Sequence, residues 1–198
     1  FQPATGAMKV YTTANGLLGE QFNYRSSFET EDGTIYLGSI DGFVAFNPKN
    51  FSENKSLPSI VITDFLLFGK EVYPGDPSSP LKKSINFLDE LVLQPDQNSF
   101  SFRVAALDFQ APRMNQIMYK LDGFDDEWLP VGESPVVSYS NLWYGNYTFR
   151  VKASNSDGVW NENEVSLIVR ILPPFYLTIW AYCVYVLLII GCSLYAVW

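Results

Sequence analysis

Residues 146–154 (NYTFRVKAS) and residues 164–171 (EVSLIVRI) decide the fold of this chain. Apolar side chains such as Phe149 and Val151 alternate there with polar ones such as Arg150. A period of two residues is typical of β-strands that bury one face and expose the other. The two segments therefore predict two long strands, each with one face in a core.

Five further strands are expected ahead of these two. Each is a run of β-branched and aromatic residues bounded by turn signals, and together they cover residues 60–68, 91–93, 99–107, 117–121 and 136–139. Seven strands in about 115 residues predict an immunoglobulin-like β-sandwich over residues 59–173. Tyr147 follows Gly145 and Asn146, and is a candidate tyrosine corner whose hydroxyl would bond to the backbone of the preceding turn.

Residues 1–48 predict a separate small β unit. Two turn signals, Asp32-Gly33 and Asp41-Gly42, lie nine residues apart. Short strands are expected around them, at residues 8–12, 26–30, 34–39 and 43–46. This pattern suits part of one β-propeller blade or a small meander, and a blade needs neighbouring blades to bury its faces. The polar residues 49–58 then predict a linker.

The last 24 residues, from Phe175 to Trp198, contain no Asp, Glu, Lys or Arg. A helix of that length would be roughly 36 Å long, enough to cross a hydrocarbon core of about 30 Å. Aromatic residues gather at its start, as in a membrane-interface belt: Tyr176, Trp180, Tyr182 and Tyr185. Residues 175–198 therefore predict a transmembrane helix, and a buried C-terminal helix is the alternative.

Composition excludes several classes of function. The chain has 21 acidic and 13 basic residues and a net charge of −8, which disfavours nucleic acid as a partner. It contains no histidine, so Ser-His-Asp catalysis and histidine metal sites are unavailable. Cys183 and Cys192 both lie in the apolar tail and are interpreted as small apolar residues. We expect no catalytic residue, metal or cofactor in this chain.

The two ends of the sequence predict that it is an internal part of a larger membrane protein. The first residues, FQPATGAMKVYTT, lack the basic and apolar regions of a signal peptide, and no Lys/Arg cluster follows the apolar tail. If the tail spans a membrane, residues 1–174 are expected outside the cytoplasm.

Several positions of the first segment match a known repeat. They are Asn15-Gly16-Leu17, Phe22, Asp32-Gly33, Ile35-Tyr36-Leu37-Gly38, Gly42 and Phe46-Asn47-Pro48. In this pattern the segment resembles the propeller repeat of bacterial two-component regulators. Tyr36 stands where that repeat usually has tryptophan.

A longer set of positions matches in the second domain. It contains Tyr119, Lys120, Leu121, Asp122, Gly123, Trp128, Tyr139, Asn141, Leu142, Gly145, Tyr147, Phe149, Val151, Ala153, Asn155, Gly158 and Trp160. In this order the residues resemble the three-tyrosine domain that follows such propellers. We interpret Tyr119, Gly123, Trp128, Tyr139, Asn141, Gly145, Tyr147 and Trp160 as its structural signature.

The two resemblances together imply the sensor half of a membrane-bound hybrid two-component system. In that family the propellers bind oligosaccharides in the periplasm and a kinase lies beyond the inner membrane. The resemblance thus implies an oligosaccharide ligand on blades upstream of this chain, a homodimer, and a periplasmic location for residues 1–174. Pro173 and Pro174, whose fixed φ angles limit slack, are the expected signal-coupling residues between domain and helix.

Two other functions stay open at this point. The sandwich could itself be a carbohydrate-binding module of a membrane-anchored surface protein, with Trp128, Trp143, Tyr144 or Trp160 stacking on sugar rings. Alternatively, Asp125 and Asp126 could serve as the paired carboxylates of a surface hydrolase. Adjacent residues of a strand point to opposite faces and loop carboxylates are mostly solvated, so a structural or solvated role is preferred.

Overall fold

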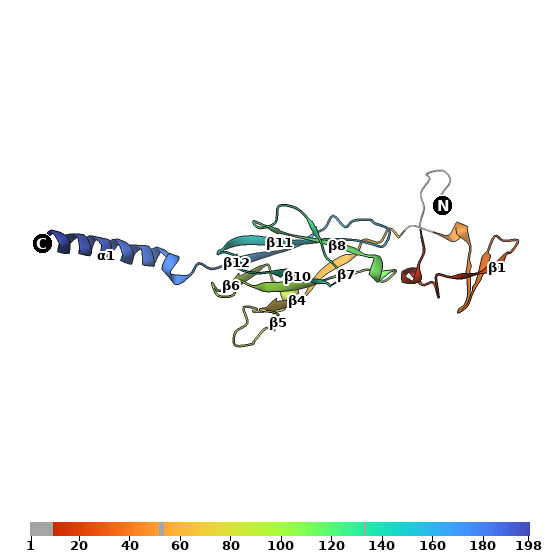
Figure 1. The fold of residues 1–198 in the computed structure, drawn as a ribbon, viewed down its shortest axis with the longest axis horizontal. Helices are drawn as coiled ribbons and strands as arrows, with labels where there is room; N and C mark the ends of the chain where they lie inside the picture. The colour runs from red at the N-terminus through yellow and green to blue at the C-terminus, as the bar shows by residue number, and fades with distance from the viewer. Residues whose placement is uncertain (1–9, 52–53, 133) are drawn as a thin grey trace. The chain divides into compact units, whose positions relative to one another are not determined.

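The computed structural model describes residues 10–51, 54–132 and 134–198, and the chain divides into two compact units. The first unit contains residues 1–59 together with the segments 106–116 and 153–162. The second contains residues 60–105, 117–152 and 163–198. Figure 1 shows the elements of both units along the chain.

A three-stranded antiparallel meander forms the sheet of the first unit. Its strands are β1 (Phe22–Glu29), β2 (Ile35–Ser39) and β3 (Gly42–Phe46). The Asp-Gly pairs mark the two turns, as predicted, although Gly42 is already the first residue of β3, and Gly33 and Gly42 adopt positive φ angles that favour glycine. The strand expected at residues 8–12 falls partly outside the described residues, and Thr12 instead caps the short 3₁₀ helix η1 (Thr13–Asn15).

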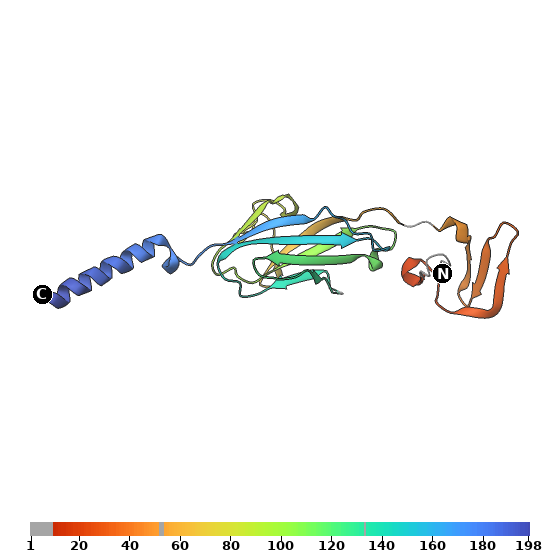
Figure 2. The ribbon, with the colours of Figure 1, turned by 90° about the horizontal axis from the view of Figure 1, so that it is seen from above.

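Nine strands form the predicted β-sandwich, shown from two directions in Figures 1 and 2. One sheet has the order β10-β7-β4-β5 and the other the order β6-β12-β11-β8-β9. The strands are β4 (Ser59–Leu67), β5 (Lys70–Glu71), β6 (Glu90–Leu93), β7 (Phe100–Leu107), β8 (Gln116–Asp122), β9 (Leu129–Pro130), β10 (Val136–Tyr139), β11 (Gly145–Ser154) and β12 (Val165–Ile171). Short 3₁₀ helices lie between strands and before the final helix: η2 (Pro48–Asn50), η3 (Ile85–Phe87), η4 (Pro112–Met114) and η5 (Phe175–Leu177).

Aromatic side chains join the two sheets in the core. Phe102 of β7 and Phe149 of β11 are both fully buried, and their rings stack with centroids 4.4 Å apart. The ring centroids of Phe65 on β4 and Phe102 are 5.7 Å apart, so the aromatic packing extends along the four-stranded sheet. The alternation that the sequence predicts for β7, β11 and β12 therefore corresponds to their buried faces, which confirms the all-β sandwich.

The apolar tail forms a single α-helix, α1 (Ile179–Val197). It begins four residues later than the predicted start at Phe175, because η5 and the extended Thr178 precede it. The described side chains of α1 are exposed to solvent except that of Ala181, which is half-buried. This helix is long and apolar enough to cross a membrane, and none of its 18-residue apolar window is buried.

Candidate functional site

Three signature tyrosines lie on three strands of the sandwich: Tyr119 on β8, Tyr139 on β10 and Tyr147 on β11. Tyr139 is buried, and its ring packs edge-on against Tyr119 with centroids 6.3 Å apart. The Tyr139 hydroxyl donates a hydrogen bond of 2.8 Å to Oδ2 of Asp125. Asp125 lies in the loop that follows β8, and β8 and β10 belong to different sheets. This hydrogen bond therefore ties the two sheets together.

Asp125 also accepts a hydrogen bond of 2.8 Å from the backbone N–H of Leu121. The sequence offered this residue, with Asp126, as a candidate catalytic pair. In the structure the Asp125 carboxylate binds a tyrosine hydroxyl and a backbone amide, while Asp126 and Glu127 are exposed. Asp125 is therefore an anchor of the tyrosine cluster, a role that the sequence reasoning missed because its partner Tyr139 is 14 residues away.

Burial and the hydrogen bond to Asp125 raise the pKa of Tyr139 well above its ordinary value of about 10. Burial and the nearby Asp125 charge also raise the pKa of Tyr119. A folded-state pKa above the unfolded value gives stability that is complete below pH about 10 and is lost as the pH rises further.

We therefore expect the midpoint of urea unfolding to fall with pH above about 10, and Tyr139→Phe to flatten that fall. Near-UV circular dichroism would follow the midpoint from about pH 8 to about pH 11.5, a range on both sides of the ordinary tyrosine pKa. Tyr144→Phe, which removes an exposed hydroxyl, is the matched control. An alkaline profile that is the same in Tyr139→Phe and the parent chain would contradict this assignment.

Tyr147 forms the predicted tyrosine corner. Its hydroxyl donates a 3.0 Å hydrogen bond to the backbone carbonyl of Trp143, in the turn before β11. Gly123 has a φ of +94°, and a Cβ placed on it would lie 3.2 Å from Cδ1 of the Tyr147 ring. Gly145 also lies against this ring. The hydroxyl bond and the two glycines thus hold the Tyr147 ring in place, and a side chain at position 123 would crowd that ring.

The remaining signature residues lie at turns and on the outer face of the five-stranded sheet. The Trp128 ring is covered by two cations of β11, with Lys152 Nζ at 4.4 Å and Arg150 Cζ at 5.3 Å from its centroid. Asn141 adopts a positive φ of 55° in the turn before β11. Trp160 forms an isolated β-bridge with Ser154. Trp128 is thus held by cation–π contacts, which the alternation of β11 alone did not predict.

A hydrogen-bonded clamp holds residues 54–58 of the predicted linker within the first unit. Asn155 is 1% exposed, and its Nδ2 donates to the backbone carbonyls of Asn54, at 2.5 Å, and Ser56, at 2.8 Å. Asn161 donates in the same way to the carbonyl of Pro58 at 2.9 Å. These partners are about a hundred residues apart in the sequence, so no local pattern could have paired them.

The buried side chain of Asn54 extends this clamp. Its backbone N–H donates to Asp157 Oδ2 at 2.7 Å, and its Nδ2 donates to Asp108 Oδ2 at 3.1 Å. Residues 54–58 are therefore fixed by side chains from the loops that follow β7 and β11.

The connection from β12 to the helix is short and contains the predicted coupling residues. Gly145 of β11 is in register with Ile171, and the Leu172 N–H still donates to the carbonyl of Leu93 at 3.0 Å. Pro173 and Pro174 follow at once, and Pro174, with φ −63° and ψ 153°, is the residue that opens η5. The chain thus leaves the sheet through two residues whose φ angles the proline rings fix.

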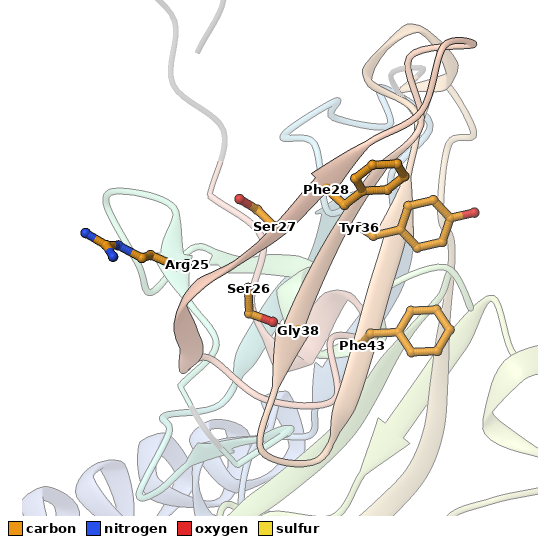
Figure 3. Close-up of a pocket in the computed structure, with 7 residues that line it drawn as sticks. All are labelled: Arg25, Ser26, Ser27, Phe28, Tyr36, Gly38 and Phe43. Carbon is orange, nitrogen blue, oxygen red and sulfur yellow. The ribbon is translucent and has the colours of Figure 1, made fainter.

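The sheet of the first unit carries a shallow hollow, drawn in Figure 3. Residues of all three strands line it: Arg25, Ser26, Ser27, Phe28, Tyr36, Gly38 and Phe43. Figure 3 shows the rings of Phe28, Tyr36 and Phe43 on one side of the sheet. These rings are exposed, so the meander presents an aromatic face within the described part of the first unit.

Comparison with protein families places a Y_Y_Y domain model on residues 108–172. In this segment the chain is similar to the Y_Y_Y domain family. The match covers the strands β8 to β12, which carry the three tyrosines and their anchor Asp125. It thereby confirms the family that the order of signature residues predicted.

Relatives extend the match across most of the chain. Histidine kinase P4 of Formosa agariphila is 33% identical over 185 residues, which are 93% of this chain and 13% of that protein. The extracellular domain of hybrid two component system BT3049 from B. thetaiotaomicron has a TM-score of 0.66 and 27% identity over 82% of this chain. The extracellular domain of BT4673 from the same organism, also described as a hybrid two component system, has a TM-score of 0.55 and 28% identity over 79% of this chain.

This chain spans only 13% of that kinase and about a fifth of each of the two solved domains, at 22% and 21%. Through its match to the Y_Y_Y model and its similarity to these proteins, the chain resembles the extracellular part of proteins of the two-component, histidine kinase type. Together with this similarity, the apolar helix α1 indicates a membrane-anchored protein with an exterior domain.

Proposed function

We propose that this chain is the membrane-proximal part of a periplasmic glycan sensor, and that it relays ligand binding through the inner membrane to a kinase. The observation that carries the proposal is the direct succession of a Y_Y_Y domain and an apolar helix, in a chain related to a histidine kinase. In this arrangement the domain is the last folded element before the membrane.

Within this proposal, the meander β1–β3 belongs to the last blade of a propeller. Its exposed aromatic face, with Phe28, Tyr36 and Phe43, would pack on the preceding blade. The upstream blades would bind the oligosaccharide, and two copies of the receptor would form a homodimer whose sandwiches change their arrangement on binding. A ligand drives such a change only if it binds the two arrangements with different affinity.

The relay needs firm connections on both sides of the sandwich, and the clamp at residues 54–58 supplies one of them. Asn155 and Asn161 hold three backbone carbonyls of that segment, which leaves it little freedom to move independently of the loops after β7 and β11. Displacement of the blade would therefore reach the Y_Y_Y domain through these hydrogen bonds.

We expect Asn155→Ala in the full-length receptor to reduce ligand-dependent phosphorylation about fivefold or more, while the affinity for the oligosaccharide is unchanged. The reason is that the substitution removes the two hydrogen bonds that Asn155 donates to the backbone carbonyls of Asn54 and Ser56. Calorimetric titration would measure the affinity and a phosphotransfer assay the output, at a temperature where circular dichroism shows a folded receptor.

The matched control is Asn98→Ala, which removes the side chain of a half-buried asparagine at the other end of β7 and β11 from the clamp. It should leave both affinity and phosphorylation as in the parent. Full ligand-dependent phosphorylation in Asn155→Ala would contradict a relay through this segment.

A further inference from the structure

Exposed aromatic side chains gather at the end of the sandwich from which the chain leaves for α1. Phe68 is 60% exposed and Trp143 is 66% exposed. Tyr144 is exposed as well, and its ring lies 5.3 Å from that of Trp143. Large exposed aromatic groups clustered on a soluble surface mark an interaction site.

Hydrogen bonds bring these residues to one place. The N–H of Phe68, after β4, donates to the carbonyl of Ser99 at 3.1 Å. The N–H of Asn141 donates to Oγ of the same Ser99 at 3.2 Å, and the N–H of Leu142 donates to the carbonyl of Asn98 at 3.1 Å. The turn at 68–69 and the turn at 140–144 therefore flank one loop, residues 94–99.

The same end carries the exit toward the helix. Gly145, next to Tyr144, is in register with Ile171, and Leu93, at the start of the 94–99 loop, is also in register with Ile171. The seven residues 172–178 connect β12 to Ile179, the first residue of α1. Fully extended, this connection would reach at most about 25 Å, and η5 shortens it further.

The conformation of Phe68 argues that its exposure has a role. Phe68 and Gly69 form the two-residue turn between β4 and β5, with φ angles of +51° and +75°. Such a turn favours asparagine or glycine at both positions, and a bulky residue there is strained. Here the strained residue is an aromatic ring that is mostly exposed to solvent, so packing within the sandwich does not explain it.

We propose that Phe68, Trp143 and Tyr144 form a membrane-contacting surface that inserts into the interface of the bilayer beside α1. The proposal rests on the part of the proposed function in which α1 spans the membrane. The amphipathic rings of Trp143 and Tyr144 suit the headgroup level, where their polar edges stay hydrated, and the apolar ring of Phe68 suits the acyl side of the interface. Contacts at two turns in addition to the helix would fix the tilt of the Y_Y_Y domain on the membrane.

Tryptophan quenching by lipid tests this surface in the chain as it stands. The chain would be reconstituted into vesicles of phosphatidylethanolamine and phosphatidylglycerol that contain lipids brominated high on the acyl chain. We expect Trp143→Phe to remove a distinct part of the quenched emission. The substitution leaves the tyrosine corner intact, because the Tyr147 hydroxyl binds the backbone carbonyl of residue 143.

Two further variants separate the possible failures. Trp160→Phe changes a tryptophan beyond the far end of β11 and should leave the quenched emission unchanged. Trp180→Phe should remove another part of the quenched emission, since Trp180 lies in the first turn of α1. Loss of quenching in Trp180→Phe but not in Trp143→Phe would overturn the surface and leave the membrane span standing.

No quenching loss in either variant would overturn the span and the surface together. If brominated lipid did not quench Trp143 while soluble oligosaccharide shifted its emission wavelength saturably, the proposal would also be overturned, in favour of sugar binding.

Discussion

Replacing Phe149 with alanine is expected to lower the free energy of unfolding of the β-sandwich by about 3–5 kcal/mol. Phe149 is fully buried on β11, its ring stacks on Phe102 of the opposite sheet, and it packs edge-on against Tyr139 with centroids 6.3 Å apart. Truncation therefore removes buried apolar area and leaves a cavity between the two sheets, next to the tyrosine that anchors them.

Urea unfolding of the chain in detergent, followed by near-UV circular dichroism, would measure this loss. The matched control is Thr148→Ala, the neighbouring residue of β11, whose side chain points to the opposite face of the sheet. It should change the free energy by less than about 1 kcal/mol. A loss below about 1 kcal/mol in Phe149→Ala would mean that the contact between the sheets does not hold this domain together.

The parts of the fold that depend on local pattern were predictable from the sequence. Alternation located β7, β11 and β12 to within a residue or two, because each of these strands buries one face. The tyrosine corner was predictable because Tyr147 and its acceptor Trp143 are four residues apart. The two-residue strands β5 and β9 were missed, because two residues show no periodicity.

Interactions between distant residues explain what the sequence did not predict. The role of Asp125 depends on Tyr139, which comes from the other sheet, and the role of Asn155 depends on backbone carbonyls at positions 54 and 56. Carbonyl groups are present at every residue, so the sequence carries no mark of which ones are bound. The start of α1 was misplaced for a related reason: apolar composition is continuous from Phe175, and only backbone geometry separates η5 from the helix.

Under the proposed function, replacing Pro173-Pro174 with Gly-Ser in the full-length receptor is expected to abolish most of the dependence of phosphorylation on ligand. Upstream of this step, Leu172 is still hydrogen-bonded to Leu93 of the sheet, and downstream, Pro174 opens η5 directly before α1. Two prolines hold φ near −65°, whereas Gly-Ser samples many conformations. A displacement of β12 would then be absorbed by the connection before it reached the helix.

Coupling between two sites is commonly about 1–3 kcal/mol, so its loss should reduce the response to ligand by about fivefold or more. Oligosaccharide affinity and the thermal midpoint of the sandwich should stay at the parent values, because neither proline is part of the core. Pro95→Gly is the matched control: it loosens a turn of the neighbouring 94–99 loop, which does not lead to the helix. An unchanged phosphorylation response to ligand in the Gly-Ser variant would show that the signal reaches the membrane without a stiff connection. The membrane-contacting surface of Phe68, Trp143 and Tyr144 would then be the remaining route, since it lies at the same end of the domain.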